Sequence, residues 1–364
     1  MRIAHMVFSF NSGGIENLLV DILNSWNNED SVLLCIINNE KNDKLIERIQ
    51  KKNSTQVVCL GRRPGSAKYE YVKKLNGLLT DFKPDVVHCH SNNVFLFALP
   101  IKLLHPQWRF VLTIHDTNTY CRYGKMTPVL HRMFLARIIA ISYSVKGEIL
   151  QRGIPESKVC MIYNGVDTQK FVEHKPKTPG GKKTIICVSR IYPEKKGQDI
   201  LVKAAARLKC TRQDFCVLLA GEPPVEHPEY LEELKKVIKA EQVEDEIVLL
   251  GNRNDVPELL STADVYVMPS RFEGFGISLV EAMLAKVPVV ASDLDGPHEI
   301  IKDQYGYLFE KEDDAMLCQI LNNLLDADTS ILTEKAYQYA REKFDIRVMV
   351  QNLRKVYSRG GETE

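Results

Sequence analysis

Short apolar runs alternate with amphipathic segments along almost the whole chain. In the first half, the apolar runs predict strands at Ile3–Val7, Ser31–Ile37, Gln56–Leu60, Asp85–Cys89, Arg109–Ile114 and Ile138–Ile141. Between them, apolar positions at helical spacing predict helices at Ile15–Trp26, Tyr69–Phe82 and Val94–Leu104. Strands that alternate with helices in this way are typical of a parallel sheet covered on both faces.

The second half repeats the alternation. Its predicted strands are Thr184–Val188, Cys216–Ala220, Ile247–Leu250, Val265–Val267, Val287–Ala291 and Gly306–Leu308. Its predicted helices are Gln198–Lys209, Glu229–Ala240, Ile277–Lys286 and Ala315–Leu325. The fold class is therefore α/β, with two doubly wound, Rossmann-like domains. Ligands of such sheets bind beyond the carboxyl ends of the strands, so we expect a cleft between the two domains to hold the site.

The boundaries follow from composition and pattern. Residues 172–183 are rich in Lys, Pro and Gly, which is typical of a linker. We expect an N-terminal domain at 1–171 and a C-terminal domain at 184–345. Residues 346–364 begin with apolar positions at helical spacing and predict a terminal helix that packs on one of the domains.

Composition and charge favour a cytoplasmic protein. The chain has 364 residues and nine cysteines without a Cys-x-x-Cys pair, as expected in a reducing compartment. No apolar run approaches the roughly 20 residues that span a bilayer, and no signal peptide is visible. The net charge of +1 hides an excess of eight positive charges in residues 1–170 and of seven negative charges beyond them. Opposite charges either help the halves face each other or bring the basic half to an anionic membrane surface.

The segment from Glu273 to Glu281 carries the strongest chemical signal. Gly274 and Gly276 permit a close approach of the backbone to a ligand, and a helix is expected to begin at Ile277. Unpaired N–H groups at a helix start bind anions, so Phe275, Gly276 and Ile277 are candidates to hold phosphate. We expect Glu281 to accept hydrogen bonds from ribose and Glu273 to face a sugar. The alternative is a helix start with two solvated acids.

Two further groups could bind the same ligand. Gly13 and Gly14 follow the first predicted strand and could form an anion nest, or merely a tight turn. Arg190 and Lys196 follow the strand Thr184–Val188, where two cations would hold a diphosphate and stabilise a departing phosphate. A solvated basic loop is the alternative.

The remaining candidates follow other predicted strands. His115 would project toward the cleft and bond a sugar hydroxyl, or serve a structural role. Asn252 and Arg253 follow Ile247–Leu250 and are expected near a nucleotide base. His88 and His90 are expected to be structural or to lie on the acceptor side, and we expect no metal site, because no His, Cys and Asp cluster has ligand spacing.

In combination, these motifs resemble the family-4 retaining glycosyltransferases. The segment Glu273–Glu281 resembles the family signature, Gly13-Gly14-Ile15-Glu16 its glycine loop, and Arg190 with Lys196-Gly197 its phosphate-binding pair. Three further segments resemble the family pattern: Asn164–Asp167, Pro288–Ala291 and Gly296–Glu299. Within the last of them, His298 differs from the residue that is common in the family. The resemblance covers residues 1 to about 345. It implies a GT-B fold whose C-terminal helix crosses back to the N-terminal domain.

The resemblance also implies a function. We expect retaining transfer of a sugar from a nucleotide-sugar, with UDP favoured over GDP, to a hydroxyl acceptor such as a lipid-linked saccharide in bacterial surface polysaccharide synthesis. It implies His115, Arg190, Lys196 and Glu273 as catalytic residues, and no divalent metal or other cofactor. The mixed basic and apolar residues at 122–125 and 129–137 have two interpretations: peripheral contact with the inner membrane surface, or a helix packed on its own sheet whose arginines reach solvent. No nucleic acid partner is expected. The alternatives are a sugar-nucleotide epimerase, a phosphorylase and a non-catalytic nucleotide-sugar-binding partner of another transferase.

Overall fold

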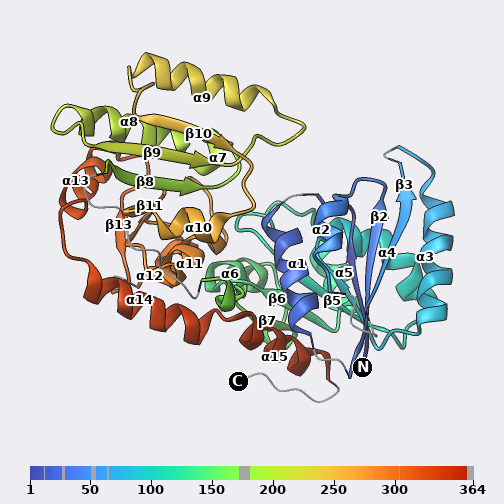
Figure 1. Ribbon diagram of the computed structural model, residues 1–364. Helices are drawn as coiled ribbons and strands as arrows, with labels where there is room; N and C mark the ends of the chain where they lie inside the picture. Colours follow the sequence, from blue (N-terminus) through green and yellow to red (C-terminus); the bar gives the residue numbers. More distant parts are fainter. Residues whose placement is uncertain are drawn as a thin grey trace. The chain divides into compact units, whose positions relative to one another are not determined.

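The computed structural model describes residues 1–11, 13–26, 29–50, 55–63, 65–171, 181–302 and 304–358, and these form two compact units (Figure 1). Unit 1 comprises Met1–Gly165 together with the chain from Ile346 onward, and unit 2 comprises Val166–Asp345. The predicted linker at 172–183 lies largely outside the described residues. No described helix has the length and apolar character that would let it cross a membrane.

Unit 1 is built on a parallel sheet of seven strands in the order β3-β2-β1-β4-β5-β6-β7. The strands are β1 (Arg2–Val7), β2 (Ser31–Asn38), β3 (Thr55–Arg62), β4 (Val86–Cys89), β5 (Arg109–Ile114), β6 (Arg137–Ala140) and β7 (Val159–Met161). The helices are α1 (Gly14–Ser25), α2 (Asp43–Glu47), α3 (Lys68–Phe82), α4 (Asn92–Leu104), α5 (Met126–Phe134), α6 (Tyr143–Gln151) and the 3-10 turn η1 (Glu156–Lys158). Helix α1 contacts α2, and α3 contacts α4.

Unit 2 has a parallel sheet of six strands in the order β10-β9-β8-β11-β12-β13. The strands are β8 (Lys183–Val188), β9 (Phe215–Ala220), β10 (Ile247–Gly251), β11 (Val265–Met268), β12 (Val289–Ser292) and β13 (Tyr307–Phe309). The helical segments are η2 (Thr168–Phe171), α7 (Pro193–Lys196), α8 (Gln198–Lys209), α9 (Glu229–Ala240), α10 (Val256–Ser261), α11 (Ile277–Leu284), α12 (Asp295–Ile301), α13 (Asp314–Leu324) and α14 (Ser330–Lys343). Helix α8 contacts α9 and α13, while α11 contacts α10 and α14.

The prediction of two doubly wound α/β domains is confirmed, and so is the return of the C-terminal helix. Helix α15 (Ile346–Tyr357) packs on α1 of unit 1, and its apolar face joins that unit's core through Ile346, Met349, Val350 and Leu353. Its apolar spacing made this helix predictable, because one stripe of the helix must be buried.

The structure divides the chain at Gly165, six residues before the expected boundary at 171. The backbone N–H of Val166 donates to the carbonyl of Phe344 at 2.8 Å, and the Thr168 hydroxyl donates to the carboxylate of Asp345. These bonds hold the first residues after Gly165 within unit 2. Strand β7 and helix α14 were not predicted, because β7 has three residues and α14 buries only Thr333, Ala336 and Ala340.

Candidate functional site

The centre of the candidate site is an ion pair between Lys196 and Glu273. The Lys196 ammonium lies 2.8 Å from the Glu273 carboxylate, and the two side chains are 20% and 16% exposed. Lys196 is the last residue of α7, which follows β8, and Glu273 lies in the loop after β11. Because β8 and β11 are neighbours in a parallel sheet, their carboxyl ends lie side by side and bring the two residues together.

Backbone contacts hold these two loops against each other. The N–H groups of Arg271 and Phe272 donate to the carbonyl oxygen of Lys195 at 2.8 and 3.2 Å. Gly197 has a φ of +65°, and a Cβ atom there would lie 1.8 Å from the carbonyl oxygen of Pro269. Glycine is therefore required next to Lys196, both for its backbone conformation and for the close approach of the β11 loop.

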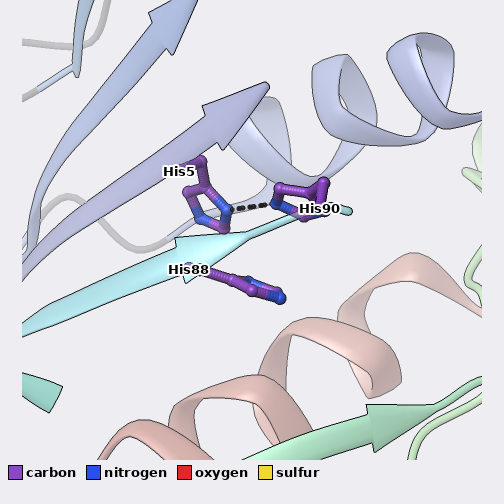
Figure 2. Close-up of side chains that lie close together, drawn as sticks. All are labelled: His5, His88 and His90. Atoms are coloured by element: carbon purple, nitrogen blue, oxygen red, sulfur yellow. Dashed lines mark hydrogen bonds between the residues drawn. The ribbon is translucent and has the colours of Figure 1, made fainter. Parts of the chain in front are cut away.

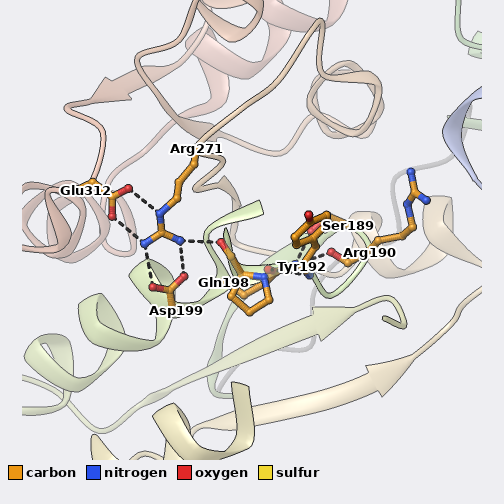
Figure 3. Close-up of polar contacts among 8 residues, drawn as sticks. Ser189, Arg190, Tyr192, Gln198, Asp199, Arg271 and Glu312 are labelled. Carbon is orange, nitrogen blue, oxygen red and sulfur yellow. Dashed lines mark hydrogen bonds and ion pairs between the residues drawn. The ribbon is translucent and has the colours of Figure 1, made fainter. Parts of the chain in front are cut away.

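Arg271 ties the same loops together from the other side. Figure 3 shows its guanidinium between the carboxylates of Asp199 and Glu312, with distances of 2.6–2.9 Å to Asp199 and 2.6–2.7 Å to Glu312. It also donates to the carbonyl oxygen of Pro193 at 2.6 Å. The hydrogen bond to Asp199 raises the pKa of Arg271 above its usual value, and the hydrogen bond to Glu312 raises it further. Sequence reasoning missed this network, because Asp199 and Glu312 are far from Arg271 along the chain.

Arg190 lies on the same loop, two residues beyond β8, but the structure does not pair it with Lys196 or Glu273. Its side chain is exposed and extends away from the Arg271 network in Figure 3. Its carbonyl oxygen accepts a hydrogen bond from the Gln198 amide at 2.7 Å. The same amide donates to the Ser189 hydroxyl at 2.9 Å, and Gln198 accepts from the Tyr192 N–H at 3.4 Å. The buried Gln198 thus sets the path of the loop that carries Arg190.

Helix α11 begins at Ile277, as predicted, after Gly276 with a φ of +110°. Phe275 is buried, and its ring lies edge-on to that of Phe344 at 5.4 Å between centroids. Only glycine adopts the Gly276 conformation readily, so the loop can turn directly into the helix. The first N–H groups of a helix lack partners within it and form a place for an anion.

Both acids of the predicted signature influence one buried phenol. Tyr266 of β11 is 1% exposed, and its hydroxyl donates to the Ser278 hydroxyl at 2.7 Å. Burial raises the pKa of Tyr266 well above its usual value, and the negative charges of Glu273 and Glu281 act in the same direction. Glu281 is itself half-buried in α11. The two acids therefore lie within electrostatic reach of the same hydroxyl, which the sequence pattern did not identify.

Asn252 and Arg253 follow the edge strand β10, two places from β8 in the sheet order. Together with Asn254, Asp255 and Glu258 they line an open hollow of about 420 Å³. The Arg253 guanidinium binds Asp255 at 2.6 and 2.8 Å. This ion pair is solvent-exposed, with side chains 40% and 41% accessible.

In unit 1, the glycine loop lies at the start of α1. Gly13 precedes the helix and Gly14 is its first residue, while Ser12 lies outside the described residues. A Cβ atom on Gly13 would lie 2.4 Å from the carboxylate of Glu16, and the Asn17 amide donates to the Gly13 carbonyl at 2.9 Å. The loop is therefore folded tightly onto the first turn of α1.

His115 belongs to a group of histidines on the central strands of unit 1. Its Nε2 lies 3.2 Å from Nδ1 of His90, and burial lowers the pKa of His115 to about 4. His5, His88 and His90 bring possible metal-ligand nitrogens within 4.8 Å of one another, and Figure 2 shows that they come from β1, from β4 and from the residues just after β4. The sequence spacing did not reveal this cluster, because His5 joins it only through the pairing of β1 with β4.

Comparison with known proteins identifies two family matches and several relatives. Residues 12–170 match the model for Glycosyltransferase Family 4, and residues 168–343 match that for Glycosyl transferases group 1. The putative colanic acid biosynthesis glycosyltransferase WcaL of Escherichia coli (strain K12) is 28% identical and aligns over 82% of this chain and 75% of its own. An Escherichia coli UDP-Gal:alpha-D-GlcNAc-diphosphoundecaprenol alpha-1,3-galactosyltransferase is 24% identical over 77% and 76%. The crystal structure of Anabaena HepE in complex with UDP and glucose is similar with a TM-score of 0.83, at 23% identity and 98% coverage of both chains.

Proposed function

Because the chain belongs to the group 1, family-4 glycosyltransferases and has their GT-B fold, we propose that it transfers a hexose or N-acetylhexosamine from a UDP-sugar to a hydroxyl group of a lipid-linked saccharide, with retention of configuration and without a divalent metal. Unit 2 binds the donor and unit 1 contributes the acceptor side together with His115. The product belongs to the synthesis of a surface polysaccharide.

The observation that carries the proposal is the Lys196–Glu273 pair beside the start of α11. The ammonium is partly buried and is held at one point by a 2.8 Å contact to the carboxylate. A diphosphate that binds at the helix N-terminus places its negative charge near this ammonium, which then stabilises the charge that grows on the leaving oxygen. Among the described residues the Arg190 guanidinium has no carboxylate partner, so it is available for the same diphosphate.

The proposed reaction takes place on one face of the sugar. The acceptor oxygen forms a bond to the anomeric carbon, and the bond from that carbon to the diphosphate oxygen breaks with its electron pair. The departing oxygen takes the proton of the acceptor hydroxyl. Glu273 and His115 hold sugar hydroxyls, and Glu281 binds the ribose. The protein acts mainly by orienting the substrates and stabilising charge.

The choice of donor and acceptor is supported by two of the similar proteins. HepE was crystallised with UDP and glucose, and the galactosyltransferase relative is named for a UDP-sugar donor and a diphosphoundecaprenol-linked acceptor. The hollow beside Asn252 and Arg253 offers backbone and amide groups for the base at the edge of the unit 2 sheet. UDP is therefore the favoured nucleotide.

The first experiment measures thermal stabilisation by UDP, GDP and their sugars. A ligand that binds only the folded protein raises the melting temperature according to its concentration relative to its Kd. We expect UDP and one or more UDP-sugars to raise it, and Lys196→Ala to abolish the shift. The reaction itself is tested by incubating the protein with the UDP-sugar and a lipid-linked saccharide. NMR of the product then shows whether the anomeric configuration is retained. Stabilisation by GDP alone would contradict the choice of donor, and epimerisation without acceptor would contradict the transferase.

The exposed side chains of α5 support peripheral contact of unit 1 with a membrane that carries a lipid-linked acceptor. Helix α5 exposes Met126 and Met133 at 66% and 64% beside Lys125 and Arg132, so that apolar and basic side chains share one surface. We expect the protein to float with anionic vesicles and to be released by salt. Equal recovery with neutral and anionic vesicles, or no flotation, would contradict peripheral contact.

A further inference from the structure

Three histidines form a continuous hydrogen-bonded chain across the centre of unit 1. Nδ1 of His5 lies 3.0 Å from Nε2 of His90, and Nδ1 of His90 lies 3.2 Å from Nε2 of His115. Strand β4 lies between β1 and β5, so the three residues come from adjacent strands or from the turns that follow them. The first of these bonds is the dashed line in Figure 2.

The chain consists of neutral imidazoles. Burial lowers the pKa values of His5 and His115 to about 4, and it lowers that of His90 well below its usual value. A neutral imidazole has one N–H and one lone pair, so His90 donates on one side and accepts on the other. If His115 donates to His90, then His90 donates to His5. If His90 donates to His115 instead, His5 donates to His90. The two bonds therefore allow only two arrangements, and each fixes all three tautomers.

Each end of the chain is a buried nitrogen without a partner among the described residues: Nε2 of His5 and Nδ1 of His115. His5 is fully buried, with its ring beside those of Trp26 and Tyr357. His115 is only partly buried as a residue and directly follows β5 at its carboxyl end. Both end nitrogens are thus enclosed by protein, and the one on His115 belongs to the residue that we assign to the sugar.

The group His5, His88 and His90 meets the distance requirement for a metal site, but the contacts of these residues favour hydrogen bonding. His88 already uses both nitrogens, since Nε2 lies 2.7 Å from the Thr113 hydroxyl and Nδ1 is hydrogen-bonded to the Tyr357 hydroxyl. The rings of His5 and His90 are stacked, with an interplanar angle of 26°. In Figure 2, the ring of His88 points toward α15, while its centroid lies 4.2 Å from that of the His90 ring. A divalent charge would also be buried with no carboxylate in this group of ligands.

We propose that His5 and His90 are positioning residues that hold His115 in one tautomer and one ring orientation at the carboxyl end of β5. The role toward the sugar rests on the proposed function, whereas the coupling of the three tautomers does not. In a neutral imidazole, the hydrogen bond at one nitrogen decides whether the other nitrogen carries the proton. Two such bonds in series therefore transmit the choice of tautomer from β1 to the turn after β5.

The coupling is tested by NMR of the ligand-free protein with ¹⁵N-labelled histidine, because a nitrogen that carries a hydrogen and one that carries a lone pair give well-separated signals. We expect a single neutral tautomer for His5, His90 and His115. His5→Leu removes the interior partner, and we expect His115 to become a mixture. His5→Asn offers an amide near the Nδ1 position and should restore the single tautomer. His88→Gln, which alters a neighbour outside the chain, should leave His115 unchanged. A mixture in the folded wild-type protein, or an unchanged His115 in His5→Leu, would overturn the proposal.

The role in turnover is tested with UDP-glucose as the probe, by measuring release of UDP. We expect His5→Leu to lower kcat at least about tenfold while KM changes less than about threefold, and His5→Asn to recover most of kcat. Circular dichroism confirms that each variant is folded. Equal kcat values for wild type and His5→Leu would overturn the positioning role. If the wild-type protein neither binds nor turns over UDP-glucose or any other sugar nucleotide, the proposed function fails, and the NMR result still decides the coupling.

A measurement of bound zinc tests the remaining alternative, in which His5, His88 and His90 form a metal site. After incubation with zinc and gel filtration, we expect less than a stoichiometric amount in both wild type and His88→Gln. One equivalent of zinc that is retained by the wild type and lost in His88→Gln would identify the cluster as a metal site and overturn the proposal.

Discussion

Substitution of Lys196 by alanine tests the centre of the proposed site. In the folded protein the Lys196 ammonium and the Glu273 carboxylate are 2.8 Å apart and only 20% and 16% exposed. Removal of the ammonium leaves a poorly solvated carboxylate, but one that water can still reach. We therefore expect a loss of about 1 to 2 kcal/mol in the free energy of unfolding, the lower part of the range for a buried polar group that is left without its partner.

The effect on turnover should be larger than the effect on stability. If the ammonium stabilises charge on the leaving diphosphate, its loss costs about 2.7 kcal/mol or more in the transition state, which corresponds to at least about a hundredfold in kcat/KM. We expect the same loss for Glu273→Ala, and a double variant that is not much slower than either single one, since the two residues act as a unit.

The assay is transfer from the UDP-sugar selected by thermal shift, measured as UDP release and product formation. Lys195→Ala is the matched control, because it removes a neighbouring lysine side chain and retains the carbonyl that accepts from Arg271 and Phe272. We expect this control to retain activity within about threefold. A folded Lys196→Ala protein with turnover close to that of the wild type would refute the assignment.

The remaining predictions concern the loop, pH and metals. Gly197→Ala should destabilise the protein by more than about 2 kcal/mol in urea unfolding, since its Cβ would lie 1.8 Å from the Pro269 carbonyl at a φ of +65°; an unchanged midpoint would contradict the close approach. Burial lowers the pKa values of His5 and His115 to about 4 in the folded protein, below the ordinary value of 6.5, so the unfolded chain binds more protons when the pH lies between these values. Stability should therefore fall as pH drops from 7 to 5, by up to about 2 kcal/mol per histidine, and His115→Gln should weaken this dependence; the same slope in both proteins would argue against it. Transfer should persist in excess EDTA, and a loss reversed by magnesium or manganese would exclude metal independence.

Much of the architecture could be predicted from the chain alone, because each sheet is buried on both faces and its strands appear as short apolar runs. The starts of α8, α9 and α11 at Gln198, Glu229 and Ile277 agree with the predicted positions. The pattern failed where an element is very short or buries few large apolar side chains. Strand β7 is three residues long, and α14 buries few large apolar side chains, so neither gives a clear periodic signal.

The candidate site could be predicted only as a set of separate motifs. Lys196 and Glu273 were chosen from their positions after strands, and they lie in contact because β8 and β11 are paired. The sequence also grouped Arg190 with Lys196, and this grouping stays a prediction; the structure adds that the Arg190 side chain extends away from the network around Arg271 (Figure 3). Spacing along the chain indicates which turn a residue occupies, but the rotamer and the neighbours decide where its charge lies.

The sequence by itself determined the two repeated α/β units, the helix that returns to the first unit and the residue types at each strand end. Only the tertiary structure decided which of those residues meet. The guanidinium of Arg271 joins Asp199 and Glu312, and His5 reaches His90 and, through it, His115. The physical reason is that apolar periodicity records burial, which is a local property of each segment. Contacts between polar side chains depend on strand order and on loop paths, which bring together residues that are distant along the chain.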